Sequence, residues 1–194
     1  MTKDAPMNSY YQNRVLGYFS SIAIANDFDV EIFVGRPQGF EIRSNADLFS
    51  KVLAEVNSFG KLYIRMAEAN TSDQRPHIII HTHVLNSLYI RDTVCASVLD
   101  IKGQHFSFEG TDTSQSHLIG QVENFNIKMF GSAKLNAIEL EAKNISVSCN
   151  HTSQIKLFAQ NSIAGSAYGN SYLHYKGNPE LAVFNAGQSF ISAL

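Results

Sequence analysis

The sequence predicts an all-β protein: a parallel β-solenoid of about five coils, preceded by a β-rich N-terminal region with at most one short helix. Three observations lead to this fold class. Apolar and polar residues alternate along much of the chain, which is the period of a strand. After residue 77 no helical period is found, and amide side chains recur about every 20 residues, as stacked coils require. An antiparallel β-sandwich, with those amides as ordinary turn residues, is the alternative.

Length, composition and charge limit the class of protein. The 194 residues fit one domain, and a hydrophobic content of 44% is enough for a sizeable core. With 15 basic and 17 acidic side chains the formal charge is −2, so the basic surface typical of nucleic-acid-binding proteins is not expected. The most apolar stretch, residues 77–85, is too short to span a bilayer, and we expect no membrane insertion.

The first residues are expected to form a polar tail. Residues 1–15 lack the apolar segment of an export signal. The protein is therefore expected in the cytoplasm as written, or outside it, in the periplasm or at the cell surface, if a leader was removed from a longer precursor.

Residues 16–76 are expected to form a β-rich N-terminal part of the same domain. Phe28, Val30, Ile32 and Val34 alternate with polar neighbours and predict the buried face of one strand. The apolar spacing within residues 45–56, which begin with Asn45 as a candidate N-cap, predicts the single helix.

Residues 77–194 are expected to form the coils and a C-terminal cap. The recurring amides, spaced by 20, 20, 17 and 17 residues, are Gln104, Asn124, Asn144, Asn161 and Asn178. Each is followed within three residues by an apolar side chain, namely Phe106, Phe125, Ile145, Ile163 and Leu181. A second apolar register contains Leu118, Ile138, Ile155 and Leu173. An amide at a coil corner suits left-handed backbone and can hydrogen-bond the equivalent amide one coil away, so we expect a structural turn ladder.

Several segments resemble the bacterial head GIN domain family, described as auto-transporter adhesins and as a domain of unknown function. The similar segments are residues 18–32, 40–47, 56–64 and 171–179, and the resemblance extends over about residues 18–192. It implies a right-handed parallel β-helix in an exported or surface-associated protein, and it implies no reaction. Where the family has Ser-Gly turns, this chain keeps glycine in three of four and has Asn150-His151 in the fourth, where Asn150 is expected to tolerate positive φ.

Two small clusters are the candidates for chemistry. His81 and His83 share one face of a strand and are candidate metal ligands. His77, the nearest third histidine, is about 13 Å from His81 on an extended chain, too far to bind the same ion. A solvated polar face is therefore the favoured interpretation. Glu139 and Glu141 are candidate catalytic carboxylates about 7 Å apart. GxSxG, HExxH, P-loop and GxGxxG motifs are absent from the sequence, and no cofactor is expected.

These observations favour a non-enzymatic, adhesin-like binding or structural module. The expected partner is a cell-surface polymer such as a glycan, or a second copy of the chain. A β-helical carbohydrate-active enzyme, of the polysaccharide lyase or hydrolase type, is the alternative. Tyr168, Tyr172 and Tyr175 are expected to cover the end of the stack rather than to bind sugar. Cys95 and Cys149 are expected to be buried free thiols, with a disulfide as the alternative.

Overall fold

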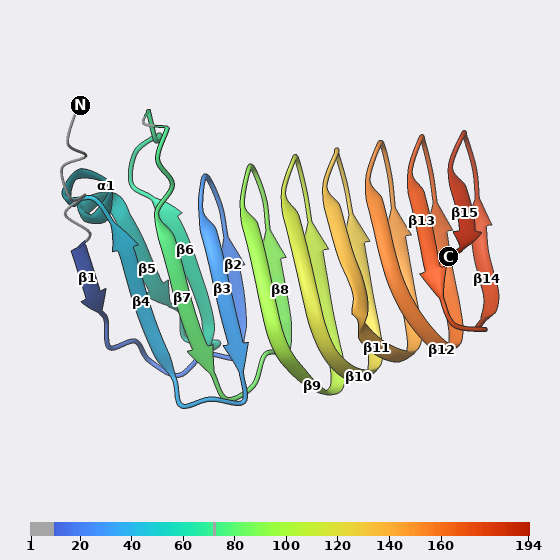
Figure 1. The fold of residues 1–194 in the computed structure, drawn as a ribbon, viewed down its shortest axis with the longest axis horizontal. Coiled ribbons are helices and arrows are strands. Elements are labelled where there is room, and N and C mark those ends of the chain that lie inside the picture. The colour runs from blue at the N-terminus through green and yellow to red at the C-terminus, as the bar shows by residue number, and fades with distance from the viewer. Residues whose placement is uncertain (1–9, 72) are drawn as a thin grey trace, which may run out of the picture.

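The computed structural model describes residues 10–71 and 73–194, which form an elongated stack of β-coils (Figure 1). The described part before residue 83 contains β1 (Tyr10–Asn13), β2 (Ser21–Ile24), β3 (Asp29–Val34), β4 (Gly39–Ser44), α1 (Ala46–Lys51), β5 (Val52–Val56), β6 (Lys61–Met66) and β7 (His77–Thr82). The part after it contains β8 (Ser87–Ile90), β9 (Cys95–Gly110), β10 (Gln115–Met129), β11 (Lys134–Cys149), β12 (Gln154–Ala167), β13 (Tyr172–Lys176), β14 (Glu180–Asn185) and β15 (Phe190–Ala193). The predicted all-β solenoid of about five coils with one short helix is confirmed.

The coils build two parallel ladders of strands. The first ladder runs β7-β3-β9-β10-β11-β12-β13-β15, and the second runs β6-β2-β8-β9-β10-β11-β12-β14. Strands β9 to β12 are 14 to 16 residues long, so each bends and contributes its first half to the first ladder and its second half to the second. The strand hydrogen bonds between successive coils therefore run along the whole stack.

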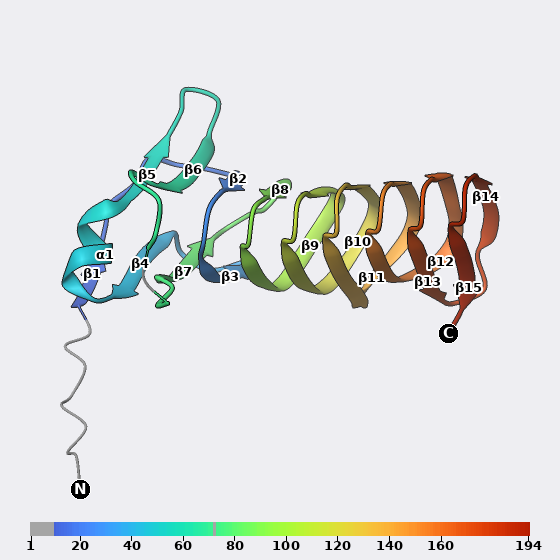
Figure 2. The same cartoon turned by 90° about the horizontal axis from the view of Figure 1, so that it is seen from above.

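The order of the coils in space differs from their order in the chain. Strand β3 lies between β7 and β9, and β2 lies between β6 and β8. The coil of residues 21–34 is thus inserted between a coil made later, from residues 61–82, and the rest of the stack. Antiparallel strands occur at the N-terminal end, where β4 pairs with β7 and β1, and β5 pairs with β6 (Figure 2).

The helix is shorter than the sequence pattern predicts. It covers Ala46–Lys51, and Asn45 caps it as expected, because its side chain accepts a hydrogen bond from the backbone of Leu48. The prediction of helix to residue 56 is wrong: Val52–Val56 is strand β5. The β-branched Val52 and Val56 favour a strand, and an antiparallel partner, β6, is available to pair with it.

Inward side chains of successive coils form columns. One column is the apolar register that follows the predicted amides: Phe106, Phe125, Ile145, Ile163 and Leu181 are neighbours in strand register. Phe106 and Phe125 are both 1% exposed and stack with ring centroids 5.5 Å apart. The alternating strand at residues 28–34 also buries its predicted face.

The turns that lead into β3, β9 to β13 and β15 of the first ladder each contain one residue with positive φ. The residues with positive φ at this position are Asn26, Asp92, Asp112, Gly131, His151, Gly169 and Gly187. The five predicted amides are not among the residues with positive φ, so a different position of the coil carries the tight turn. At the Asn150-His151 turn the left-handed residue is His151, with φ 60°, and the expectation for Asn150 is wrong. Asn150 stays in register and donates its backbone N–H to Met129.

Side chains link neighbouring turns in addition to the backbone. The carboxylate of Asp112 accepts hydrogen bonds from the Thr111 hydroxyl at 2.8 Å and from the backbone N–H of Asp92 at 3.1 Å. These donors stabilise the charged form and hold the pKa of Asp112 below its usual value. Asp92 in turn accepts from the backbone N–H of Asn26 at 2.6 Å.

The C-terminal segment completes the last coil of the stack. Strand β14 pairs with β12, and β15 pairs with β13, so the segment lies on the preceding coil. Its outer side is open, and Leu181, Phe184 and Phe190 are 44%, 62% and 51% exposed. Tyr168 and Tyr172 do not cover this end, because their rings lie beside Phe184 and Phe190 of the neighbouring coil.

The two cysteines are free and have different environments. Cys149 is fully buried and donates to the Ser171 hydroxyl at 3.5 Å. Cys95 is half-buried on the outer side of β9, and Arg75 Nη1 lies 3.3 Å from its sulfur. Burial raises the pKa of the Cys149 thiol. The expectation of two buried thiols is therefore right for Cys149 and wrong for Cys95.

This difference predicts selective labelling. In the folded protein one thiol per chain should react with a maleimide or disulfide reagent, and two should react after unfolding, because the thiolate is the reactive form and only Cys95 is accessible. Mass spectrometry of the labelled protein measures the count. Cys95→Ser should abolish native labelling and Cys149→Ser should leave it unchanged; labelling of both thiols at similar rates would contradict the prediction.

Candidate functional site

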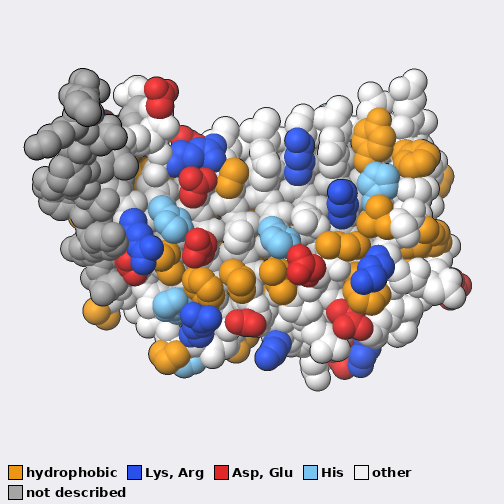
Figure 3. Space-filling model, viewed as in Figure 1, with side chains coloured by type: hydrophobic (Ala, Val, Ile, Leu, Met, Phe, Trp, Pro, Cys, Tyr) orange, Lys and Arg blue, Asp and Glu red, His pale blue; other side chains and the backbone are white. Residues whose placement is uncertain are grey.

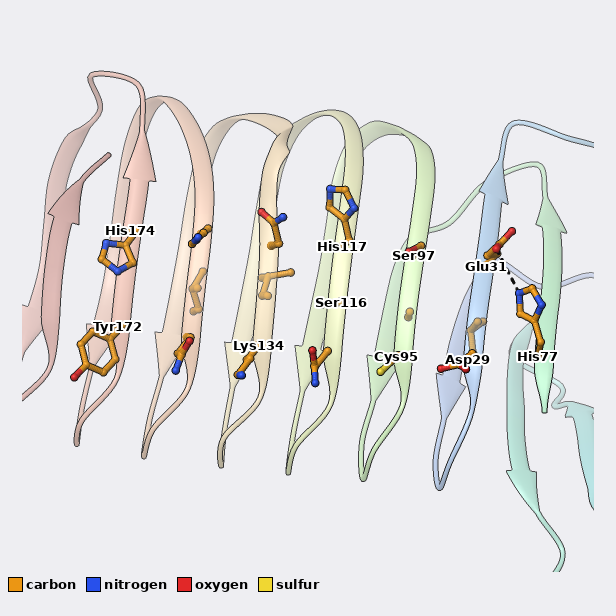
Figure 4. Close-up of a pocket in the computed structure, with 18 residues that line it drawn as sticks. Asp29, Glu31, His77, Cys95, Ser97, Ser116, His117, Lys134, Tyr172 and His174 are labelled. Carbon is orange, nitrogen blue, oxygen red and sulfur yellow. Dashed lines mark ion pairs between the residues drawn. The ribbon is translucent and has the colours of Figure 1, made fainter. Parts of the chain in front are cut away.

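A groove on the outer face of the first ladder is the candidate functional site. It has a volume of about 770 Å³ and crosses β7, β3 and β9 to β13 (Figure 4). The exposed and half-buried side chains that line it point outward because they alternate with core residues along each strand. The strand hydrogen bonds thus fix the spacing of the groove residues along the stack.

Two rows of mainly polar side chains line the groove. The row nearer the turns consists of Asp29, Cys95, Gln115, Lys134, Gln154 and Tyr172, which are successive neighbours in strand register. Two residues further along each strand, the second row consists of Glu31, Ser97, His117, Asn136, Lys156 and His174. Neighbouring members of a row are about 4.8 Å apart, the spacing of paired strands. The groove therefore offers hydrogen-bonding groups at regular intervals along the stack.

Apolar side chains border the rows. Phe33, Leu99 and Ile119 are half-buried and line a second hollow of about 280 Å³ next to Glu31 and His117. Figure 3, which looks at this face, shows hydrophobic side chains along its middle with charged and His side chains beside them. The face thus combines an apolar strip with polar groups, the combination that ligand sites commonly use.

The acidic side chains of the groove have contacts with basic residues at one end, and two lysines without ion pairs to described residues lie towards the other. Arg75 contacts Asp27 at 2.6 Å and Asp29 at 3.2 Å, and His77 lies 3.4 Å from Glu31 (Figure 4). Towards the other end, no described residue forms an ion pair with Lys134 or Lys156, both of which are exposed.

The last strand of the groove adds two rings. His174 Nδ1 lies 2.9 Å from the Ser192 hydroxyl, which holds the imidazole in place. Tyr172 is 45% exposed, and its ring centroid is 6.5 Å from that of Phe190. The β13 end of the groove thus presents an accessible aromatic ring beside an imidazole.

The predicted metal ligands do not assemble into a site. His81 lies in β7 with its ring against Phe33, at a centroid distance of 5.3 Å, and His83 is exposed beyond the end of the strand. Among the described residues no three His, Cys, Asp or Glu side chains come together to hold an ion.

The predicted catalytic carboxylates are engaged separately. Glu139 Oε1 lies 2.9 Å from His117 Nε2, and Glu141 accepts a hydrogen bond from Gln160. Their register neighbours on β10, Ile119 and Gln121, are not acidic. Neither glutamate lines the groove. This arrangement gives no support to paired acid–base chemistry at these two residues.

The predicted turn ladder forms in its central part. Asn144 Nδ2 donates to Asn124 Oδ1 at 3.3 Å, and Asn124 Nδ2 donates to the backbone oxygen of Gln104 at 3.3 Å. On the next coil Ser162, not Asn161, is the register neighbour of Asn144 and donates to it at 3.0 Å. Asn178 lies in the link between β13 and β14. The ladder is thus a link between coils, with two of the five amide side chains bonded to each other.

The groove is not among the sequence-based expectations, although the sequence contains a signal for it. Triplets in which two polar or tyrosine side chains flank an apolar one follow the turns of four coils, at residues 29–31, 134–136, 154–156 and 172–174, and residues 115–117 have serine in the middle. Each triplet begins a strand of the first ladder. Its first and third side chains therefore face the groove. His117 and His174 are scattered in the sequence, but they belong to one row in the structure.

Comparisons with known proteins agree on the fold. The family model described as "Putative auto-transporter adhesin, head GIN domain" matches residues 18–179. A crystal structure of a "putative adhesin" from Bacteroides fragilis is similar with a TM-score of 0.75 at 13% identity, covering 96% of this chain and 97% of that one. A "putative adhesin" from Parabacteroides distasonis has a TM-score of 0.59 at 12% identity, covering 97% and 98%.

A third structure carries a different description. A "putative lipid binding protein" from Parabacteroides distasonis has a TM-score of 0.57 at 15% identity, covering 97% of this chain and 98% of that one. At these identities the likeness concerns the fold alone. No curated protein is detectably similar in sequence. Among the described residues no helix is long and apolar enough to cross a membrane.

Proposed function

Because the chain belongs to the head GIN domain family, we propose that it is a non-enzymatic, adhesin-like module of the cell surface whose groove binds an extended glycan. The single observation that carries this proposal is the groove itself, with two rows of mainly polar side chains across six strands. The description of the family supports the surface location.

The geometry of the groove suits a polymer better than a compact ligand. Equivalent positions repeat about every 4.8 Å along the stack, so a chain that lies along it meets two outward side chains at each coil. Hydrogen-bonded strands hold these groups in place before the ligand arrives, which reduces the entropy lost on binding. Amides, imidazoles and hydroxyls are groups that pair with sugar hydroxyls.

The test is glycan-array binding followed by calorimetry on the full chain. Removing two amides of one row, with Gln115→Ala and Gln154→Ala together, should weaken binding of the glycan that the array identifies about tenfold, at roughly 0.5–1.5 kcal/mol for each hydrogen bond. Asn126→Ala, an exposed amide on the second-ladder half of β10, is the matched control and should not change the affinity.

Two results would contradict the proposal. One is the absence of binding to any glycan on the array. The other is a glycan whose affinity responds to Asn126→Ala and not to the pair of groove variants.

A further inference from the structure

We infer that the half of the groove on β11 to β13 recognises the carboxylates of an acidic polysaccharide, one whose backbone contains uronic acids. This inference rests on the proposed function and names the class of glycan. It depends on four groove residues, Lys134, Asn136, Gln154 and Lys156, called here the lysine–amide square.

The first argument is the charge that remains after pairing. The two carboxylates that line the groove lie at its β3 end, where Asp29 contacts Arg75 at 3.2 Å and Glu31 lies 3.4 Å from the imidazole of His77. The two lysines that line it form no ion pair with any described residue. The groove therefore carries unpaired positive charge, and this charge is confined to β11 and β12. A ligand that complements it bears negative charge.

The second argument is the arrangement of the square. In strand register Lys134 is opposite Gln154, and Asn136 is opposite Lys156. The two lysines therefore occupy one diagonal, with backbone positions about 8 Å apart, and the two amides occupy the other. Ammonium groups pair with carboxylates, and amides both donate to and accept from hydroxyls. A sugar chain with carboxylates separated by hydroxyl-bearing carbons matches this alternation.

The third argument is the aromatic ring at the end of the square. Tyr172 follows Gln154 in the first row, and its ring is accessible. Next to it, His174 follows Lys156 in the second row. An accessible ring gives the apolar face of a sugar a surface to lie on, which a compact anion such as phosphate does not need.

The number of cations distinguishes this ligand from a nucleic acid. Nucleic acids present a phosphate at every nucleotide, and proteins that bind them gather many basic residues on one face. Here only two unpaired lysines line the groove, and the chain as a whole has a formal charge of −2. A polymer with a lower charge density, and with many hydroxyls between its carboxylates, fits better.

The experiment compares polygalacturonate with the same polymer after full methyl esterification, which removes the charge and keeps the backbone. Calorimetry at low and moderate salt on the full chain should give at least tenfold tighter binding of the acid, with an affinity that falls as salt is raised. Alginate and hyaluronan extend the acidic panel; heparin and single-stranded DNA serve as denser polyanions.

Variants locate the site. Lys134→Gln and Lys156→Gln together should weaken binding of the acidic polymer about tenfold and leave the ester unaffected. Lys128→Gln, an exposed lysine on the second-ladder half of β10, removes a charge elsewhere and is the control, with no change expected.

The outcomes separate this inference from the proposed function. Equal binding of acid and ester, or binding to neutral glycans of the array and to none of the acidic panel, overturns the inference and leaves the proposed function standing. Tighter binding of heparin or DNA than of the uronic-acid polymers also overturns it. If Lys128→Gln weakens binding as much as the double variant does, the acidic polymer does not bind at the lysine–amide square. Failure to bind any glycan overturns both.

Discussion

Gly165→Ala should destabilise the folded protein by roughly 3 kcal/mol, the cost expected when strained backbone and overpacking occur together. Gly165 lies in β12 with φ +138°, and a Cβ placed there would be 1.9 Å from the carbonyl oxygen of Val147 on the preceding coil. The clashing atom belongs to the backbone of a paired strand, so relief requires the β11–β12 ladder to move apart. Thermal unfolding followed by circular dichroism should show a melting temperature lower by about 10 °C.

Gly35→Ala is the matched control. Gly35 also has positive φ, +80°, but no atom lies within 4 Å of the Cβ that alanine would add. The substitution should therefore cost only about 1–2 kcal/mol, the strain of an L-residue in left-handed backbone. If the two variants unfold at the same temperature, close approach between coils does not limit the stability of this stack.

The contact at Gly165 is of a kind that sequence patterns do not encode. A near-20-residue repeat indicates that coils stack, and the column from Phe106 to Leu181 could be predicted because one apolar position per coil suffices to define it. Which backbone atoms then approach each other depends on the exact path of each strand. Glycine in a strand indicates a close approach without identifying its partner.

The second predicted register shows where periodicity fails. Ile155 and Leu173 do share a column, but their neighbour on β11 is Leu135, not Ile138. The register between β11 and β12 shifts after Ala137, and the register between β10 and β11 shifts between His117 and Ile119. Such bulges add or remove a residue between otherwise equivalent positions. Counting residues across them therefore assigns the wrong side chain to the column.

The N-terminal coils could be predicted as strands but not placed. The alternation of residues 28–34 gives the buried face correctly. It does not indicate that β3 pairs with β7 on one side and β9 on the other, because both partners come from segments more than 40 residues later. Without a repeat in residues 16–76, nothing in the pattern specified the order of these coils.

The candidate site was predictable only in part, for the same reason. Outward positions of the strands follow from alternation, and the polar triplets after each turn follow from the sequence. The ion pairs at the acidic end of the groove depend on Arg75, which comes from the segment before β7 and reaches Asp27 and Asp29. Charge pairing between distant segments distinguishes the two halves of the groove, and only the structure reveals it.

Phe125→Ala should destabilise the folded protein by about 3–5 kcal/mol, the cost of a large enclosed cavity in the core. Phe125 is 1% exposed, stacks on Phe106 of the preceding coil and has Ile145 of the next coil as its other neighbour, so the cavity is enclosed between two coils. In a stack where each coil contacts only its neighbours, such a cavity weakens two interfaces at once.

Leu181→Ala tests the same column at its open end. Leu181 is 44% exposed and has a neighbour in the column on one side, Ile163, so the loss should be below about 1 kcal/mol. Phe125→Leu replaces the ring with an aliphatic side chain, the kind that the next coil has at Ile145, and should cost about 1–2 kcal/mol. Chemical denaturation of the three variants measures these differences. A loss for Leu181→Ala as large as that for Phe125→Ala would mean that the last coil is covered in solution, because an exposed leucine has little burial to lose.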